Sequence, residues 1–264
     1  MENKIRVGVV GAGTMGAGIA QVAAQARHEV CLYDARPEAA GLGLGELGGA
    51  FQKLLAKGTL QPAEATAARE RISPCADLHD LRDCDLVIEA IVEDLAVKKQ
   101  VFADLENHLA PGAVLASNTS SLPITAIAAA CGKPGRVIGL HFFNPAPLMP
   151  LVEVVPGMVT APGLVDQCME LVRGWGKVPV ACKDTPGFIV NRVARPFYGE
   201  SIRIYEEGIA GMASIDHAIK TVGGFRMGPF ELMDLIGNDV NFAVTSSVWR
   251  AFFHDPRYTP SLTQ

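Results

Sequence analysis

The pattern Gly11-Ala-Gly13-Thr-Met-Gly16 constrains the fold more than any other part of the sequence. It follows residues 5–10, a short β-branched run typical of a strand buried on both faces, and precedes residues 14–26, where small and apolar side chains predict a helix. Residues 30–33 predict a second strand. A strand, a helix and a strand within about thirty residues are typical of a parallel crossover unit.

Each glycine of this turn has a separate steric task in binding a dinucleotide. Gly11 permits the tight turn, Gly13 lets a pyrophosphate approach the backbone, and Gly16 allows close packing of helix on strand. The first helical residues, Thr14 and Met15, present backbone N–H groups to phosphate at the positive end of the helix dipole. A plain strand-to-helix turn is the alternative, but a position directly between strand and helix favours dinucleotide binding.

Asp34 lies at the predicted end of the second strand. A carboxylate at this point accepts hydrogen bonds from the hydroxyls of the adenosine ribose and repels a 2′-phosphate. The alternative is an aspartate that only forms the turn after the strand. We therefore predict that the cofactor is NAD rather than NADP.

Strands and helices alternate through the first 183 residues. The predicted strands lie near residue 72 and at residues 86–91, 114–117, 137–140, 151–155 and 178–181, and the predicted helices at residues 51–57, 62–71, 97–109, 124–131 and 165–175. The alternation indicates an α/β, Rossmann-type, doubly wound and mainly parallel sheet. Between residues 39 and 50 a helix is disfavoured, because five glycines lie there and each interior Gly costs about 1 kcal/mol relative to Ala.

The character of the chain changes at the turn Asp184-Thr-Pro-Gly187. Residues 188–207 and 214–221 are predicted to be helical, and no strand pattern follows them. We therefore expect two domains, an NAD-binding Rossmann domain at residues 1–183 and a smaller all-helical domain at residues 187–264.

Composition excludes several classes of protein. Hydrophobic residues make up 49% and charged residues 19% of the chain, which is typical of a packed globular protein, and the net charge of −5 gives no general surface for nucleic acid. Six cysteines without a C-x-x-C pair argue against a disulfide framework or a zinc ribbon, so we predict no metal. With neither a signal segment nor a membrane span, we expect a cytoplasmic protein that binds no membrane.

His141 and Glu153 are the candidate acid/base pair. His141 is expected one residue after the strand 137–140, where the carboxyl ends of parallel strands meet a ligand crevice. Glu153 lies within an apolar strand, and a buried carboxylate is costly unless it is paired. A carboxylate that orients one imidazole nitrogen leaves the other to exchange a proton with substrate. A structural His with an edge-strand Glu remains the alternative.

Polar residues follow another predicted strand, in Ser117-Asn118-Thr-Ser120-Ser121. Their hydroxyl and amide groups can bind cofactor ribose and a substrate oxygen, although such residues are also ordinary loop and cap residues. Asn191 opens the helical domain, where it can equally be a polar position on a helix.

Together these segments resemble the NAD-dependent 3-hydroxyacyl-CoA dehydrogenases over nearly the whole chain. The motifs that carry the resemblance are the glycine turn continued to Gln21, Ile88-Glu-Ala-Ile-Val-Glu93 with Lys98, Ser117-Asn-Thr-Ser-Ser121, His141-Phe-Phe-Asn-Pro145, Leu151-Val-Glu-Val154, Asp184-Thr-Pro-Gly-Phe-Ile-Val-Asn-Arg192 and Met227-Gly-Pro-Phe-Glu-Leu232. The resemblance implies reversible hydride transfer between C3 of an (S)-3-hydroxyacyl-CoA and NAD.

The resemblance also implies residue roles. His141 is the catalytic acid/base and Glu153 its orienting carboxylate, while Ser120 and Asn191 contact the 3-oxygen of the substrate. Asn144, in the same loop as His141, is implied to support the site. The residues implied to line the nicotinamide-side ribose are Glu93, Lys98 and Asn118, with Asp34 on the adenosine ribose. Lys53 and Lys57 can meet the phosphates of coenzyme A, and family members form homodimers through the helical domain.

Within the family, Asn191-Arg-Val-Ala-Arg-Pro-Phe-Tyr-Gly-Glu200 and Asp239-Val-Asn-Phe-Ala-Val244 are most similar to the phenylacetate-pathway branch, which acts on 3-hydroxyadipyl-CoA. Such a substrate requires a further cationic or polar group for its distal carboxylate. Arg195 and Arg203 are the candidates, and a surface position is the alternative for both. Family members continue beyond the equivalent of residues 260–262, so the resemblance predicts an incomplete helical domain.

Two other functions remain open from sequence. One is a dehydrogenase for a small hydroxy acid on the same scaffold, which needs no coenzyme A. The other is a protein that binds NAD or acyl-CoA without turnover, because fold alone does not guarantee activity.

Overall fold

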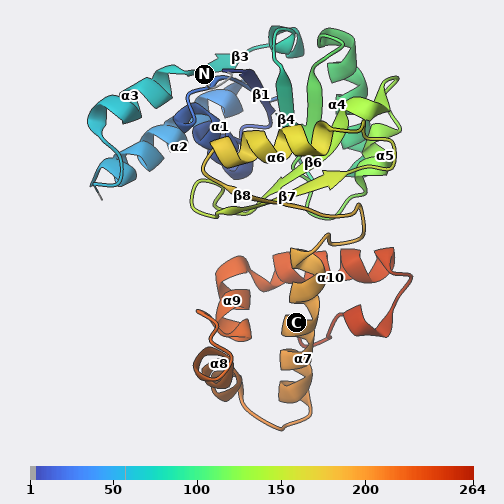
Figure 1. Cartoon of the computed structure of the whole chain (residues 1–264). Helices are drawn as coiled ribbons and strands as arrows, with labels where there is room; N and C mark the ends of the chain where they lie inside the picture. The colour runs from blue at the N-terminus through green and yellow to red at the C-terminus, as the bar shows by residue number, and fades with distance from the viewer. Residues whose placement is uncertain (1–3, 57) are drawn as a thin grey trace. The chain divides into compact units, whose positions relative to one another are not determined.

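Short apolar segments form the strands of the first part of the molecule. The computed structural model describes residues 4–56 and 58–264. The chain divides into two compact units, Met1–Asp184 and Thr185–Gln264, here called the α/β unit and the helical unit (Figure 1).

The α/β unit contains one eight-stranded sheet in the order β3-β2-β1-β4-β5-β6-β7-β8. Its strands are β1 (Arg6–Val10), β2 (Glu29–Tyr33), β3 (Ile72–Cys75), β4 (Leu86–Glu89), β5 (Val114–Ser117), β6 (Val137–Phe142), β7 (Leu151–Pro156) and β8 (Val178–Ala181). All neighbouring pairs are parallel except β6 and β7, which are antiparallel. The order reverses beside β1, as expected for a doubly wound fold, in which ligands bind at the carboxyl ends of the strands on either side of this point.

Helices lie on both faces of this sheet (Figure 1). They are α1 (Thr14–Gln25), α2 (Pro37–Ala56), α3 (Pro62–Glu70), α4 (Leu95–His108), α5 (Ile124–Ala128) and α6 (Leu164–Gly174). α1 and α6 share one core with the strands, in which Ala20 and Val172 pack with Val9 and Ile88. On α1 the small residues permit close approach to the sheet, because glycine and alanine leave little side chain between helix and strand.

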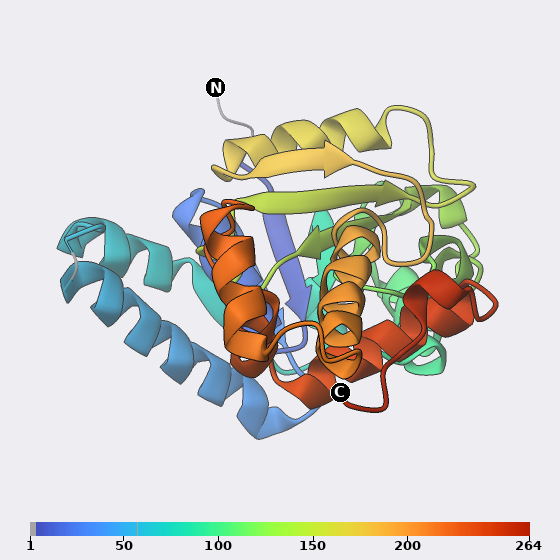
Figure 2. The same ribbon diagram turned by 90° about the horizontal axis from the view of Figure 1, so that it is seen from below.

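The glycine-rich segment was predicted to disfavour a helix, and this prediction is wrong. Residues 37–56 form the single continuous helix α2, which lies beside α3 (Figure 2). Ala40, Leu47 and Phe51 of α2 are buried. Burial of this face offsets the low propensity of the glycines, since packing of an apolar face supplies most helical stability in proteins.

The helical unit contains α7 (Val190–Glu206), α8 (Met212–Thr221), α9 (Pro229–Ile236) and α10 (Asn238–Ala251). Tyr198 and Ile202 of α7 form a small core with Met233 of α9. The Asp216 carboxylate accepts the backbone N–H groups of Phe230 and Glu231, which satisfies donors in the first turn of α9.

Within residues 4–56 and 58–264, no helix is long and apolar enough to cross a bilayer.

Candidate functional site

The glycine turn joins β1 to α1 with the geometry a dinucleotide requires. Gly11 has φ of 102°, and a Cβ there would lie 2.5 Å from the carbonyl oxygen of Ala90. A Cβ on Gly16 would lie 1.7 Å from the Gly11 carbonyl oxygen, so neither position accepts a side chain. Gly13 caps α1 without a side-chain hydrogen bond, and a Cβ there would meet nothing within 4 Å. The N-terminus of α1, with Thr14 and Met15, is thus open to a phosphate.

Asp34 follows β2 and faces this turn. Its Oδ2 accepts the backbone N–H of Ala12 at 2.8 Å, and its Oδ1 accepts the backbone N–H of Arg36 at 3.0 Å and the guanidinium Nε at 3.2 Å. Burial opposes the charged form, but the two backbone N–H donors and Arg36 outweigh it, so the pKa of Asp34 lies below its ordinary value. Asp34 is therefore an anion that orders the glycine turn. These features fit an NAD molecule whose phosphates meet α1 and whose ribose meets Asp34.

A buried ion pair lies at the end of β4. Lys98 on α4 is 1% exposed, and its Nζ lies 2.5 Å from Oε1 of Glu89, which is fully buried. Ser117 Oγ donates to the other oxygen of Glu89 at 2.7 Å, and the Ile91 N–H donates to Oε1 at 2.8 Å. Every charge in this cluster has a partner, as burial requires.

Glu93 extends the ion pair towards the loop after β5. Lys98 Nζ lies 3.3 Å from its Oε2. Oε1 of Glu93 accepts the hydroxyl of Thr119 at 2.6 Å and the N–H and hydroxyl groups of both Ser120 and Ser121 at 2.9 to 3.2 Å. Burial raises the pKa of Glu93, but Lys98 and these donors outweigh it and bring the pKa below its ordinary value. One carboxylate therefore shapes the whole Ser120 loop.

Asn118 connects this loop to the strand that carries the candidate base. Its side-chain Oδ1 accepts the backbone N–H of Phe142 at 2.8 Å, and its own N–H donates to the carbonyl of Glu89 at 2.8 Å. β1, β4, β5 and β6 are consecutive parallel strands, so the residues at their carboxyl ends gather at one edge of the sheet. The structure thus brings together the glycine turn, Glu93, Ser120 and His141.

His141 and Glu153 form a buried pair across β6 and β7. The two residues are directly opposite in the antiparallel register, and His141 Nδ1 lies 2.7 Å from Glu153 Oε2. His141 is 6% exposed and Glu153 is fully buried. The sequence pattern predicts a strand that ends one residue before His141, but β6 continues through Phe142 because β7 supplies a partner for those residues. The pairing engages Nδ1 of the imidazole with a buried carboxylate.

The loop after β6 carries Asn144, which is exposed. Buried Lys177, directly before β8, fixes this loop. Its Nζ donates to the carbonyl oxygens of Ala146, Pro147 and Met149 at 2.6, 3.1 and 2.9 Å. Burial lowers the pKa of Lys177. Nothing in the sequence marked this lysine, since its partners are backbone atoms.

The remaining candidate residues are spread over other parts of the chain. Asn191 is the second residue of α7 in the helical unit. Lys53 belongs to α2, and its side chain is not among those described; Lys57 lies outside the described residues. Sequence reasoning also missed Glu89, although its position inside a buried strand was a signal that it needed a cation.

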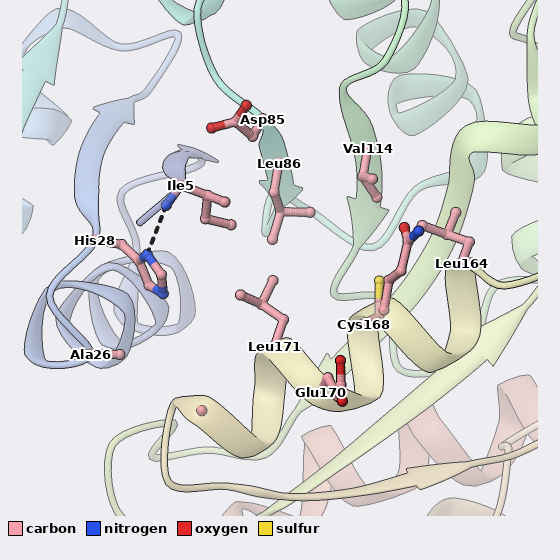
Figure 3. A pocket seen from close by; sticks show the side chains of 12 residues that line it. Ile5, Ala26, His28, Asp85, Leu86, Val114, Leu164, Cys168, Glu170 and Leu171 are labelled. Carbon is pink, nitrogen blue, oxygen red and sulfur yellow. Dashed lines mark hydrogen bonds between the residues drawn. The ribbon is translucent and has the colours of Figure 1, made fainter. Parts of the chain in front are cut away.

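A cavity of about 670 Å³ lies elsewhere in the α/β unit (Figure 3). It opens between α6 and the amino ends of β1, β4 and β5, and its lining includes Ile5, Asp85, Val114 and Cys168. The glycine turn and His141 lie at the carboxyl ends of the strands, so this cavity is not part of the candidate site. Among the residues described, no group of three or more His, Cys, Asp or Glu side chains is arranged to hold a metal ion.

Comparisons with known proteins agree with this geometry. The family profile described as "3-hydroxyacyl-CoA dehydrogenase, NAD binding domain" matches residues 6–185, and the one described as "3-hydroxyacyl-CoA dehydrogenase, C-terminal domain" matches residues 187–264.

Individual relatives cover the chain almost completely. The 3-hydroxyadipyl-CoA dehydrogenase of Escherichia coli K12 is 51% identical over 264 residues, which are 100% of this chain and 56% of that protein. The 3-hydroxybutyryl-CoA dehydrogenase of Clostridioides difficile is 41% identical over 97% of this chain and 90% of its own length. A crystal structure of 3-hydroxybutyryl-CoA dehydrogenase from Escherichia coli K12 has a TM-score of 0.96 and 51% identity, over 98% of this chain and 55% of that one.

The chain thus spans about half the length of the curated Escherichia coli relative and of the solved Escherichia coli chain, and nearly all of the clostridial protein. The predicted Rossmann-type fold and the predicted NAD cofactor are confirmed by the matched NAD-binding profile and by the structural similarity. Two profiles that together cover almost every residue, and a 41% identical relative matched over 90% of its length, establish that the chain belongs to the 3-hydroxyacyl-CoA dehydrogenase family.

Proposed function

We propose that the protein oxidises (S)-3-hydroxyacyl-CoA thioesters to 3-oxoacyl-CoA, and reduces them in the reverse direction, with His141 as the acid/base. The hydrogen-bonded pair of His141 and Glu153, at the same edge of the sheet as the glycine turn, carries this proposal. An imidazole held by a buried carboxylate is suited to take a hydroxyl proton, because the carboxylate stabilises the imidazolium that forms.

The residues divide the reaction between proton transfer and orientation. Bound NAD supplies the acceptor for the hydride that leaves C3. His141 Nε2 takes the proton of the C3 hydroxyl, and Glu153 keeps the imidazole in one tautomer and orientation. Ser120 and Asn191 hold the 3-oxygen, and Asn144 supports the same site.

The residues proposed to contact NAD lie on α4 and in the loops that follow β2, β4 and β5 of the α/β unit. Glu93, Lys98 and Asn118 contact the ribose on the nicotinamide side of NAD. Asp34 contacts the adenosine ribose. The ion pairs of Lys98 preset these groups, so little ordering is needed when the cofactor binds. Lys53 and Lys57 are the residues proposed for the coenzyme A phosphates.

The substrate class is that of short 3-hydroxyacyl-CoA thioesters, with 3-hydroxyadipyl-CoA and 3-hydroxybutyryl-CoA as the two candidates. Both substrates appear in the names of relatives at 51% and 41% identity. A role in phenylacetate catabolism is part of the proposal and rests on the resemblance of residues 191–200 and 239–244 to that branch. We further propose a cytoplasmic homodimer that associates through the helical unit.

The test measures consumption of NADH with acetoacetyl-CoA, 3-oxoadipyl-CoA and, as control, acetoacetate without coenzyme A. We expect turnover of the two thioesters only. Turnover of acetoacetate would favour a hydroxy-acid dehydrogenase, and binding of NADH without any turnover would favour a non-catalytic protein.

The variant His141→Gln is expected to lower kcat by roughly 10² to 10⁴, the usual contribution of a positioned acid/base, with little change in the Kd of NADH. His108→Gln, at the exposed end of α4, is the matched control and should retain turnover. Near-normal turnover of His141→Gln would remove this histidine from the mechanism.

A further inference from the structure

Arg195 is a buried cation in the helical unit. It lies on α7 and is 5% exposed. No Asp or Glu side chain among the described residues forms an ion pair with it. Leaving a buried charge without an opposite charge is costly, and such groups are kept where they serve a purpose.

The partners of the guanidinium are all neutral. Nη1 donates to the backbone carbonyl of Asn241 at 3.1 Å, to its side-chain Oδ1 at 3.2 Å and to Thr245 Oγ1 at 2.9 Å, and the Tyr198 ring lies 4.9 Å from the guanidinium carbon. These contacts orient the guanidinium between α7 and α10 but leave its charge uncompensated.

Two hydrogen-bond donors at this point have no partner. Arg195 Nε and Asn241 Nδ2 are both buried and make no hydrogen bond within residues 4–56 and 58–264. Buried polar atoms are nearly always satisfied, and two unsatisfied donors on side chains that contact each other, one of them a cation, indicate a place for an anionic acceptor.

The electrostatics agree with this assignment. Burial lowers the pKa of Arg195 to about 10, so the side chain still carries its charge at neutral pH. A carboxylate at the guanidinium would relieve the same penalty, because two opposite charges in contact offset the loss of hydration.

Arg203, the other candidate for the distal carboxylate, differs from Arg195 in both exposure and pairing. Its side chain is 40% exposed, and it is paired with Glu200 at 3.1 Å. An exposed ion pair of this kind contributes little and needs no further ligand.

Arg195 lies on the same helix as Asn191, the residue proposed to contact the 3-oxygen of the substrate. Arg195 follows Asn191 by four residues, so the two share one face of the helix with Cβ atoms about 5–6 Å apart. In a 3-hydroxyadipyl thioester the distal carboxyl carbon is three C–C bonds of about 1.5 Å from C3. A substrate whose 3-oxygen meets Asn191 therefore carries its carboxylate within one helical turn, the spacing of Arg195.

We propose that Arg195 and Asn241 form the binding site for the distal carboxylate of a dicarboxylic 3-hydroxyacyl-CoA, an inference that rests on the function proposed above. Arg195 supplies the charge, and Asn241 Nδ2 supplies a second hydrogen bond. Thr245 holds the guanidinium in place from α10. The site makes the enzyme selective for acyl chains that end in a carboxylate.

The experiment compares 3-oxoadipyl-CoA with 3-oxohexanoyl-CoA, which has the same chain length and a methyl group in place of the carboxylate. The ratio of their kcat/KM values isolates recognition of the carboxylate, because a general loss of folding lowers both alike. We expect wild type to prefer the adipyl thioester, and Arg195→Met to reduce that ratio by roughly 10- to 100-fold, mainly through the KM of the adipyl thioester. Arg203→Met, on the same helix, should leave the ratio unchanged.

Asn241→Asp is the second variant, and it tests the proposal even if the Arg195→Met protein does not fold. It places a carboxylate beside the guanidinium, so it should remove the adipyl preference while retaining turnover of the hexanoyl thioester. Equal turnover of both thioesters by wild type, or a ratio unchanged in both variants, would overturn the carboxylate site and leave the proposed function intact. Absence of turnover with every thioester would instead overturn the proposed function.

Discussion

Asp34 orders the glycine turn, and we expect it also to determine the choice of cofactor. Its carboxylate holds Ala12 from one oxygen and Arg36 from the other, so removal of the charge has two consequences. It ends the repulsion of a 2′-phosphate, and it releases the guanidinium of Arg36, which is 70% exposed, to bind one.

We therefore expect Asp34→Ser to raise the ratio of kcat/KM for NADPH to that for NADH on the order of 10- to 100-fold. Serine retains an oxygen for the Ala12 N–H, which limits damage to the turn. Steady-state kinetics with the preferred thioester measure the ratio, and Asp77→Ser, at the cap of a short helical turn, is the control. An unchanged ratio would place the discrimination at another residue.

The pairing of a single residue could be predicted where a charged side chain in an apolar strand required an oppositely charged partner. Glu153 lies between apolar neighbours, so a basic partner was required and His141 was available. Glu89 poses the same demand, yet its partner Lys98 is an ordinary helical lysine in sequence, and its burial depends on how α4 packs. For Arg195, the sequence could not distinguish a buried from an exposed arginine, because both follow the same helical spacing.

At the scale of elements, α2 shows the limit of propensity. Five glycines predicted a poor helix, but the contacts that form it come from α1, α3 and the sheet, which lie elsewhere in the sequence. The strands were more predictable, since buried strands are continuous apolar runs. Their direction was not predictable for β7, because an antiparallel and a parallel buried strand have the same pattern.

The glycines of α2 differ in what surrounds them, which predicts opposite effects of alanine. A Cβ on Gly41 or Gly45 would meet nothing within 4 Å, whereas a Cβ on Gly43 would lie 2.7 Å from the Ala12 carbonyl oxygen. Gly41→Ala and Gly45→Ala should each raise the free energy of unfolding by about 0.5–1 kcal/mol. Gly43→Ala should lower it.

Urea unfolding followed by circular dichroism gives these values. Gly43→Ala is also expected to weaken NADH binding, because Ala12 belongs to the glycine turn. Equal effects at all three positions would mean that α2 does not pack against the turn as described.

At the scale of the whole molecule, the change from alternating strands and helices to helices alone was visible at the turn 184–187. What sequence patterning did not show is how much apolar surface the helical unit leaves exposed. Val222 is 88% exposed, Leu235 is 70% exposed and Phe253 is 94% exposed. Large exposed apolar side chains mark an interaction surface where they form one contiguous patch.

These exposed side chains motivate the prediction that the protein is a homodimer joined through the helical unit. We expect light scattering after gel filtration to give twice the mass of the chain at micromolar concentration. Leu235→Glu should shift the protein to monomer, because a charge buried in an apolar interface without a partner costs several kcal/mol. Leu42→Glu is the matched control, since Leu42 is 67% exposed on α2 of the α/β unit and should leave the mass unchanged. A monomeric wild type would contradict the dimer, and a dimer that survives Leu235→Glu but not Leu42→Glu would place the interface on the α/β unit instead.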